Sequence, residues 1–282
     1  MTVRDLLLLS WMAYLDLPPL YVSILSGGDR VPLRAFADYV LRMDAAGKLE
    51  CVELSAASRE AARELMESQW FITGYINENN GDGFVAYTFD VGGENVVAMR
   101  GSERAGICVA SNVDWVDNVC EPFSGSVQLE SIRSLTRRFA SGKVIFTGHS
   151  KGGHNALVAL AESENPEASA AAFNGQGFSD DMLSEEGRDR LRNRGINYVV
   201  ADDVVGALLT HPERRVFVRQ ETGTNAHMPE AFMFDKAGNP VLARRTLRSR
   251  AIEFASRMAE ERIEGKVRRG VRAVCRAALE GM

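Results

Sequence analysis

The chain has 282 residues, of which 45% are hydrophobic and 25% charged, and its formal net charge is −5. This composition is typical of a globular protein with one large domain, which buries a full core without metal or disulfide support. It excludes an integral membrane protein, because no stretch approaches the roughly 18 uninterrupted apolar residues of a spanning helix. It also excludes repeat and low-complexity proteins, because no fixed period or biased tract is present.

Cysteine usage and the start of the chain both bear on its compartment. The apolar run at residues 6–9 resembles part of a secretory signal, but Asp5 precedes it, Asp16 follows it, and no small-x-small cleavage site comes before Pro18. The cysteines are scattered without a C-x-x-C pair, at Cys51, Cys108, Cys120 and Cys275. This spacing predicts neither a zinc site nor a redox motif, so we expect a cytoplasmic protein.

The first predicted elements form a helical lead-in followed by a hairpin. Helical spacing or a composition rich in helix formers predicts helices at residues 2–15, 32–43 and 57–69. From residue 83 the pattern changes to two β-rich runs, 84–89 and 96–99, which are joined by a Gly-Gly turn and therefore predict a β-hairpin.

Helices and strands alternate in the second half of the chain. We expect helices at residues 131–140, 152–161 and 184–194, and strands at 144–147, 168–173, 196–201 and 215–220. Alternation of this kind implies parallel pairing and right-handed crossovers. The sequence therefore predicts an α/β sheet that carries its ligands at the carboxyl ends of the strands.

The last segment is basic and helical. Apolar residues at helical spacing predict a long amphipathic helix over residues 246–279, and residues 244–276 hold eleven Arg or Lys against four Glu. We divide the chain into a domain of residues 1–243 and a basic helix of residues 244–282 that is packed on it or appended to it. The basic face is either a solvated face on an acidic body or a patch that contacts anionic lipid head groups or an acidic substrate.

The chemistry of the chain centres on Gly148-His149-Ser150-Lys151-Gly152, which lies where a hydrophobic strand ends and a helix begins. It fits G-x-S-x-G, the nucleophile elbow, whose sharp turn strains the serine backbone and whose glycines remove side chains that would collide. The helix N-terminus supplies free N–H groups, so the amide of Lys151 can stabilise an oxyanion. The spacing of a phosphate-binding loop is absent. We therefore predict that Ser150 is a nucleophile.

A serine nucleophile needs a base, and the chain has four histidines. His149 adjoins the serine and His154 lies on the predicted elbow helix, so we expect both to have packing roles. In an elbow fold the acid follows one late strand and the histidine follows the next. This order favours His227, which follows the strand at 215–220, over His211, which precedes it.

The acid is expected directly after the strand at 196–201, which ends in Asp202-Asp203. The side chains of adjacent residues leave the backbone in different directions, so only one of the two carboxylates is expected to meet the imidazole. The other is expected to stabilise a turn or cap a helix.

Several segments resemble the class 3 lipase family, fungal triacylglycerol lipases and their relatives, and more closely a bacterial branch of lipase-like proteins of unassigned function. The elbow is similar to the family's G-H-S-x-G-G, with lysine in place of the usual leucine. The segment Ala-Asp-Asp-Val-Val-Gly at 201–206 resembles N-D-x-V-P, which bears the acid and favours Asp203. Residues 97–102, followed by Trp115, resemble F-R-G-[ST]…W. The resemblance implies that the amide and hydroxyl of Ser102 form part of the oxyanion hole.

The resemblance implies a lipase-like α/β-hydrolase with a mostly parallel central sheet between helices. The predicted elements add an N-terminal helical lead-in and a long C-terminal helix. The resemblance also implies a serine hydrolase that cleaves small-molecule or lipid esters, with the triad Ser150, Asp203 and His227 and an oxyanion hole from Ser102 and Lys151. We expect no cofactor, no metal and no nucleic-acid partner. Two alternatives stay open: an inactive binding or scaffold protein on a hydrolase fold, and a thioesterase or acyltransferase that uses the same triad.

Overall fold

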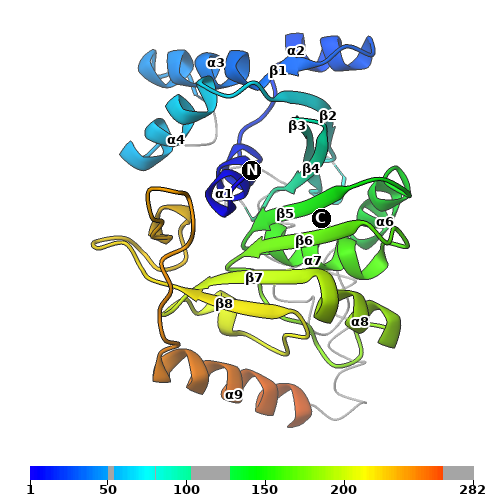
Figure 1. The fold of residues 1–282 in the computed structure, drawn as a ribbon, viewed down its shortest axis with the longest axis vertical. Coiled ribbons are helices and arrows are strands. Elements are labelled where there is room, and N and C mark those ends of the chain that lie inside the picture. The colour runs from blue at the N-terminus through cyan, green and yellow to red at the C-terminus, as the bar shows by residue number, and fades with distance from the viewer. Residues whose placement is uncertain (50–53, 80, 103–127, 263–282) are drawn as a thin grey trace.

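A computed structural model of the chain describes residues 1–49, 54–79, 81–102 and 128–262. Within these residues one eight-stranded sheet forms the centre, and its strands follow one another across the sheet in chain order (Figure 1). Strands β1 to β4 pair antiparallel and β4 to β8 pair parallel. The strands are β1 (Val31–Pro32), β2 (Phe71–Asn77), β3 (Val85–Val91), β4 (Glu94–Met99), β5 (Val144–His149), β6 (Ala168–Phe173), β7 (Gly195–Val200) and β8 (Arg214–Val218).

Helices cover both faces of this sheet. They are α1 (Val3–Met12), α2 (Pro19–Ser26), α3 (Leu33–Ala45), α4 (Ala56–Met66), α6 (Leu129–Arg137), α7 (Lys151–Glu162), α8 (Glu185–Arg194) and α9 (Leu247–Arg262), with the short 3₁₀ helices η1 (Val205–Ala207) and η2 (Pro229–Ala231). The prediction of a mostly parallel central sheet flanked by helices is confirmed. This is the fold class that the lipase resemblance implies.

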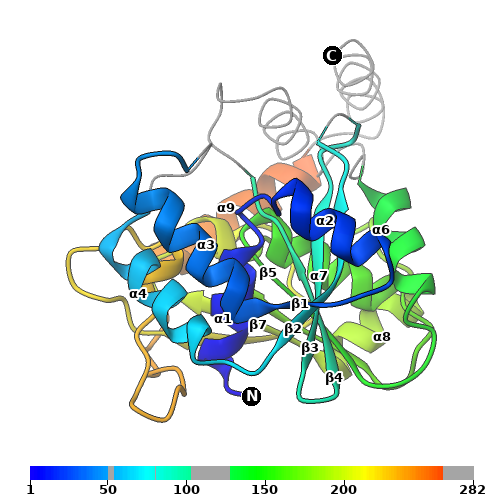
Figure 2. The same ribbon diagram turned by 90° about the horizontal axis from the view of Figure 1, so that it is seen from above.

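The linear strand order explains which helix covers which face. Right-handed crossovers that always advance in one direction place their helices on one face of a parallel sheet. Helices α6, α7 and α8 lie there, and Ile132, Leu157 and Leu191 share a core with Phe146 of β5. The opposite face needs a cover from elsewhere in the chain, and α1 supplies it (Figure 2).

Helix α1 packs its leucines directly on the sheet. A capping box begins it: the backbone N–H of Thr2 donates to Asp5, and the N–H of Asp5 donates to the Thr2 hydroxyl. Leu6 and Leu9 then join a buried core with Phe173 of β6. The apolar run near the start of the chain is therefore part of the hydrophobic core.

The helical lead-in is confirmed as α1, α3 and α4, but it also contains elements that were not predicted. The pairing of β2 with β3 shifts register between Ile72 and Gly74, which interrupts the alternating pattern of β2. Strand β1 is only two residues long. Helix α2 has proline at its first position, which suits a helix start but hides it in a sequence where Pro-Pro suggests a break.

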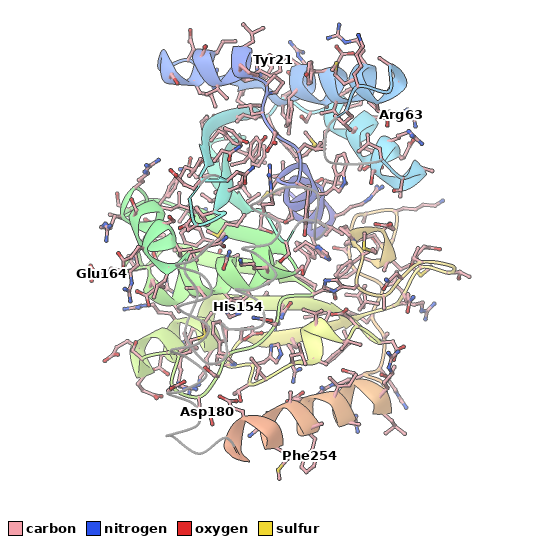
Figure 3. The ribbon with its side chains drawn as sticks, turned by 180° about the vertical axis from the view of Figure 1, so that it is seen from behind. Tyr21, Arg63, His154, Glu164, Asp180 and Phe254 are labelled. Atoms are coloured by element: carbon pink, nitrogen blue, oxygen red, sulfur yellow. The ribbon has the colours of Figure 1, made fainter. Side chains whose placement is uncertain are left out.

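Helix α9 confirms the predicted C-terminal helix over its described part, and the rest of that prediction lies outside the described residues. Ser256 accepts from the backbone N–H of Leu209, and Glu253 forms ion pairs with Arg215 and Arg245. Phe254 lies on the outer side of the helix (Figure 3). The division at residue 243 stays a prediction.

The cysteines, Trp115 and the absence of a spanning helix also figure in the sequence analysis. Cys51, Cys108, Cys120 and Cys275 all lie outside the described residues, as does Trp115. Within the described ranges, none of the helices combines the length and the apolar character needed to cross a bilayer.

Candidate active site

The nucleophile elbow is formed by the junction of β5 and α7. Ser150 sits between them with φ of 59° and ψ of −127°, a backbone conformation that a non-glycine residue rarely adopts. Its N–H donates to the carbonyl of Phe173 at 2.9 Å, so the neighbouring strand β6 holds the turn in place. The serine side chain is thereby raised at the carboxyl edge of the sheet, as the G-x-S-x-G spacing predicts.

The glycines on either side of the serine are required by contact with backbone atoms. A Cβ on Gly148 would overlap the carbonyl group of Gly152, and a Cβ on Gly152 would overlap the carbonyl oxygen of Met99 in β4. Both overlaps involve main-chain atoms of packed elements, which cannot rotate away. The glycines therefore allow α7 to lie directly against β4 and β5.

We expect Gly152→Ala to lower the free energy of unfolding by more than about 3 kcal/mol, because the added methyl group collides with backbone rather than with a flexible side chain. Urea unfolding followed by circular dichroism measures it. Gly27→Ala is the matched control: its nearest atom is the Ile24 carbonyl oxygen at 3.4 Å, so we expect a change within about 1 kcal/mol. Equal effects at both positions would contradict the role given to Gly152.

Three side chains meet in a continuous hydrogen-bonded row. His227 Nε2 lies 2.9 Å from Ser150 Oγ, and His227 Nδ1 lies 2.9 Å from Asp203 Oδ1. The second carboxylate oxygen of Asp203 accepts from the N–H of Gly206 at 2.6 Å. Because a carboxylate only accepts, the proton is on Nδ1 and the lone pair of Nε2 faces the serine hydroxyl.

Burial differs along this row in a way that suits acid–base chemistry. The side chain of Asp203 is only 1% exposed, whereas that of His227 is 29% exposed. The carboxylate therefore acts on the imidazole from a site screened from water, and the other side of the imidazole stays open to a substrate or to water.

Asp202 points away from this row. It accepts from Arg248 at 2.9 Å and from the Thr246 hydroxyl at 3.2 Å, and so holds the start of α9. The geometry thus places Asp203, and not Asp202, beside the imidazole, as the lipase resemblance implies.

The remaining histidine candidate, His211, is engaged elsewhere. Its Nδ1 lies 2.7 Å from Glu213, and both side chains are almost completely buried. His154 on α7 lies against Phe178, with ring centroids 4.7 Å apart, and contacts the Gln176 carbonyl through Nδ1. The structure therefore brings neither of them to Ser150.

The two oxyanion-hole candidates lie on either side of the elbow. Lys151 is the first residue of α7, where backbone N–H groups have no carbonyl partner within the helix, and its side chain is buried. Ser102 follows β4, and its neighbour Gly101 packs so closely on the elbow that a Cβ there would lie 2.5 Å from the His149 carbonyl oxygen. The segments that carry the two candidates therefore both border the elbow.

Residues 62–268 match the model of the Mbeg1-like family. The chain belongs to the Mbeg1-like family. No curated protein sequence matches it. Whether it belongs to the bacterial branch stays a prediction.

Solved structures similar to this Mbeg1-like chain include three lipases. They are the M37 lipase (17% identity, TM-score 0.42, covering 73% of this chain and 69% of that one), the Lip2 lipase from Yarrowia lipolytica (10%, 0.45, 90% and 90%) and a mono- and diacylglycerol lipase from Aspergillus oryzae (15%, 0.40, 74% and 90%). At TM-scores below 0.5 these similarities add nothing to the fold, which the sheet order and the elbow establish.

Two further residues of the Mbeg1-like chain contact the backbone of His227, and neither contact was predicted. His149 Nε2 lies 2.6 Å from the backbone carbonyl oxygen of His227, and Asn174 Nδ2 donates to the same oxygen at 3.1 Å. His149 was expected to have only a packing role, and Asn174 was not considered. The signal available in the sequence was the position of Asn174, one residue past the end of a parallel strand.

Within the described residues, no group of three potential ligands could hold a metal ion.

The buried imidazole of His149 makes folding stability depend on pH. Burial, and to a smaller extent the charge of nearby His227, lower the pKa of His149 from 6.5 to about 3. Between these values the unfolded chain takes up a proton at this position and the folded chain does not. The free energy of unfolding therefore falls as the pH decreases through this window.

We expect His149 to contribute about 5 kcal/mol to this loss between pH 6.5 and pH 3, at about 1.4 kcal/mol for each unit by which its pKa differs between the two states. Urea unfolding of the wild type and of His149→Gln over this range measures it, because other titrating groups cancel in the difference. Parallel curves for the two proteins would show that His149 does not titrate in this way.

Proposed function

We propose that the chain is a serine hydrolase that cleaves carboxylic esters through an acyl-enzyme. The observation that supports this proposal is the row of two 2.9 Å hydrogen bonds from Ser150 through His227 to Asp203, with the serine strained at an elbow. A binding protein on the same fold has no need of a hydroxyl aligned with a base and a buried acid.

In the first half of the proposed reaction, Ser150 Oγ attacks the ester carbonyl carbon while its proton passes to His227 Nε2. The negative charge that develops on the carbonyl oxygen is stabilised by the amides of Ser102 and Lys151 and by the Ser102 hydroxyl. As the carbon–oxygen bond to the alcohol breaks, His227 returns the proton to the leaving alkoxide. The acyl group stays on Ser150.

In the second half, water takes the place of the alcohol. His227 accepts a proton from the water as its oxygen attacks the acyl carbon, and returns that proton to Ser150 when the acyl–serine bond breaks. Asp203 holds the imidazole in the required tautomer and stabilises the imidazolium that forms in each half. The products are a carboxylic acid and a regenerated enzyme, and no cofactor takes part.

A panel of p-nitrophenyl esters with increasing acyl-chain length tests this function. We expect steady release of p-nitrophenolate, with an initial burst close to one equivalent of enzyme if deacylation is slower than acylation. Folded wild-type protein that releases none above the buffer rate with any ester would favour the scaffold alternative. Faster cleavage of matched thioesters, or transfer of the acyl group to added alcohols, would favour a thioesterase or an acyltransferase.

The outer face of α9 supports a more specific proposal about the substrate, namely a lipid ester reached at a membrane surface from the cytoplasm. Leu247 and Phe254 are 81% and 68% exposed, and Arg250 and Arg257 share their helix face and are exposed. Exposed apolar side chains can enter the head-group region of a bilayer, and neighbouring cations are attracted to anionic lipids, so this surface favours binding to an anionic membrane.

Sedimentation with vesicles of mixed phosphatidylserine and phosphatidylcholine tests this membrane contact. We expect binding that weakens when Arg250 and Arg257 are both changed to Glu, and that weakens with added salt. Unchanged binding of the double variant, or equal binding to vesicles of phosphatidylcholine alone, would contradict it.

A further inference from the structure

We propose that His149 and Asn174 are positioning residues for His227, and that they act by holding its backbone carbonyl group. This inference rests on the proposed function, because it assigns the two residues a role in keeping the base within reach of the nucleophile. Neither side chain is expected to touch the substrate.

The carbonyl oxygen of His227 is bound from two sides. His149 donates to it at 2.6 Å and Asn174 at 3.1 Å, which uses both lone pairs of the oxygen. His227 lies in a loop between β8 and η2, outside any regular element. Loops are more mobile than the elements they connect, so these two donors give the loop a fixed point at the residue whose side chain must meet both Asp203 and Ser150.

The donor state of His149 follows from its partners. A carbonyl oxygen only accepts, so Nε2 of His149 carries the proton. Burial lowers the pKa of His149 to about 3, so Nδ1 carries no proton and accepts from the Tyr14 hydroxyl at 2.9 Å. His149 therefore acts as a neutral imidazole. Its ring centroid lies 5.1 Å from that of His227, and a neutral neighbour at this distance does not oppose the positive charge that His227 gains during the reaction.

Asn174 links the base to the acid. Its side-chain amide donates to the carbonyls of Ala226 and His227, while its Oδ1 accepts from the N–H of Val200 at 2.9 Å. Val200 is the last residue of β7, three residues before Asp203. One side chain thus connects the strand that presents the acid with the loop that presents the base.

Asn174 holds this position through an unusual backbone. Its φ is 50°, in the left-handed region where asparagine is tolerated better than most residues. Its own N–H donates to the Tyr198 carbonyl at 2.9 Å, which fixes it between β6 and β7. The ends of β5, β6 and β7 therefore each supply one group that holds His227, from His149, Asn174 and Asp203 respectively.

Two substitutions of His149 separate positioning from packing. His149→Leu removes the donor, and we expect kcat to fall about 10- to 100-fold with KM changed less than about threefold, the effect of displacing a catalytic group by about 1 Å. His149→Gln keeps an N–H at a similar reach and an oxygen for Tyr14, so we expect it to recover most of the lost kcat. A purely structural role would lower the stability of both variants without this difference in kcat.

A substitution of Asn174 tests the same inference independently of His149. Asn174→Gly keeps the left-handed backbone without strain but removes all the side-chain bonds, and we expect a similar fall in kcat, also with KM little changed. Ser10→Ala is the matched control, because Ser10 is a buried polar contact between α1 and Thr147 of β5 and does not touch His227. We expect its kcat to equal that of the wild type.

These measurements distinguish the two proposals. A folded wild type that cleaves no ester overturns the proposed function. A wild type that cleaves esters, together with a folded Asn174→Gly variant of unchanged kcat, overturns the positioning role and leaves the function standing. Should His149→Leu fail to fold, the comparison of Asn174→Gly with Ser10→Ala decides. Equal kcat values for the Leu and Gln variants of His149 would likewise contradict the inference.

Discussion

Asp203→Asn is expected to lower kcat about 10⁴-fold while leaving the fold and the binding of substrate largely intact. The reason lies in the fixed partner of the carboxylate: Oδ2 accepts from the N–H of Gly206 at 2.6 Å, so the oxygen of the new amide takes that place. Its NH₂ group then faces His227 Nδ1 and donates to it. The imidazole proton moves to Nε2, and the base can no longer accept a proton from Ser150.

The neighbouring residue provides the control for this experiment. Asp202→Asn removes an ion pair with Arg248 whose side chains are both more than one-third exposed, and such pairs contribute about 1 kcal/mol or less to stability. We expect its kcat to match that of the wild type with a p-nitrophenyl ester. A loss of kcat in Asp202→Asn as large as in Asp203→Asn would show that the acid has been assigned wrongly.

Ser150→Ala is expected to lower kcat about 10⁶-fold, as removal of the nucleophile does in a serine hydrolase whose triad acts as a unit. The variant should fold normally, since alanine adopts a positive φ no less readily than serine. The residual rate should show no burst, because no acyl-enzyme can form. Stopped-flow measurement of p-nitrophenolate release compares the two proteins.

Ser163→Ala tests whether this loss is specific to the elbow. Ser163 is a buried serine that caps the opposite end of α7, where its hydroxyl accepts from the N–H of Asn165. We expect it to retain the wild-type kcat and burst. A Ser150→Ala variant that kept more than about one-tenth of the wild-type kcat would mean that another group performs the attack.

The elbow and the parallel half of the sheet could be predicted from the sequence because their signals are local. Gly148, Ser150 and Gly152 stand at a strand-to-helix junction, and the structure shows that each glycine is required by main-chain contact at that junction. Alternating strands and helices predicted the parallel pairing. The linear strand order was not predicted, because periodicity does not determine which strands are neighbours. The position of α1, on the face that this order leaves without crossover helices, was therefore not predicted either.

The choice of acid and the surroundings of the base depend on geometry that a sequence does not carry. Asp202 and Asp203 are chemically equal neighbours, and only side-chain direction separates them. His149 was expected to have a packing role because it lies beside the nucleophile, yet its ring reaches a carbonyl 78 residues later in the chain. Contacts from a side chain to a distant backbone atom leave no periodic pattern in a sequence.

Labelling with a fluorophosphonate, followed by mass spectrometry of the digested protein, tests directly whether Ser150 is an activated nucleophile, because such a reagent bonds selectively to an activated serine. We expect one adduct per chain, on the peptide that contains Ser150, formed by the wild type and not by Ser150→Ala. A folded wild type that gains no adduct, or one that is modified equally at other serines, would contradict the assignment of Ser150 as the nucleophile.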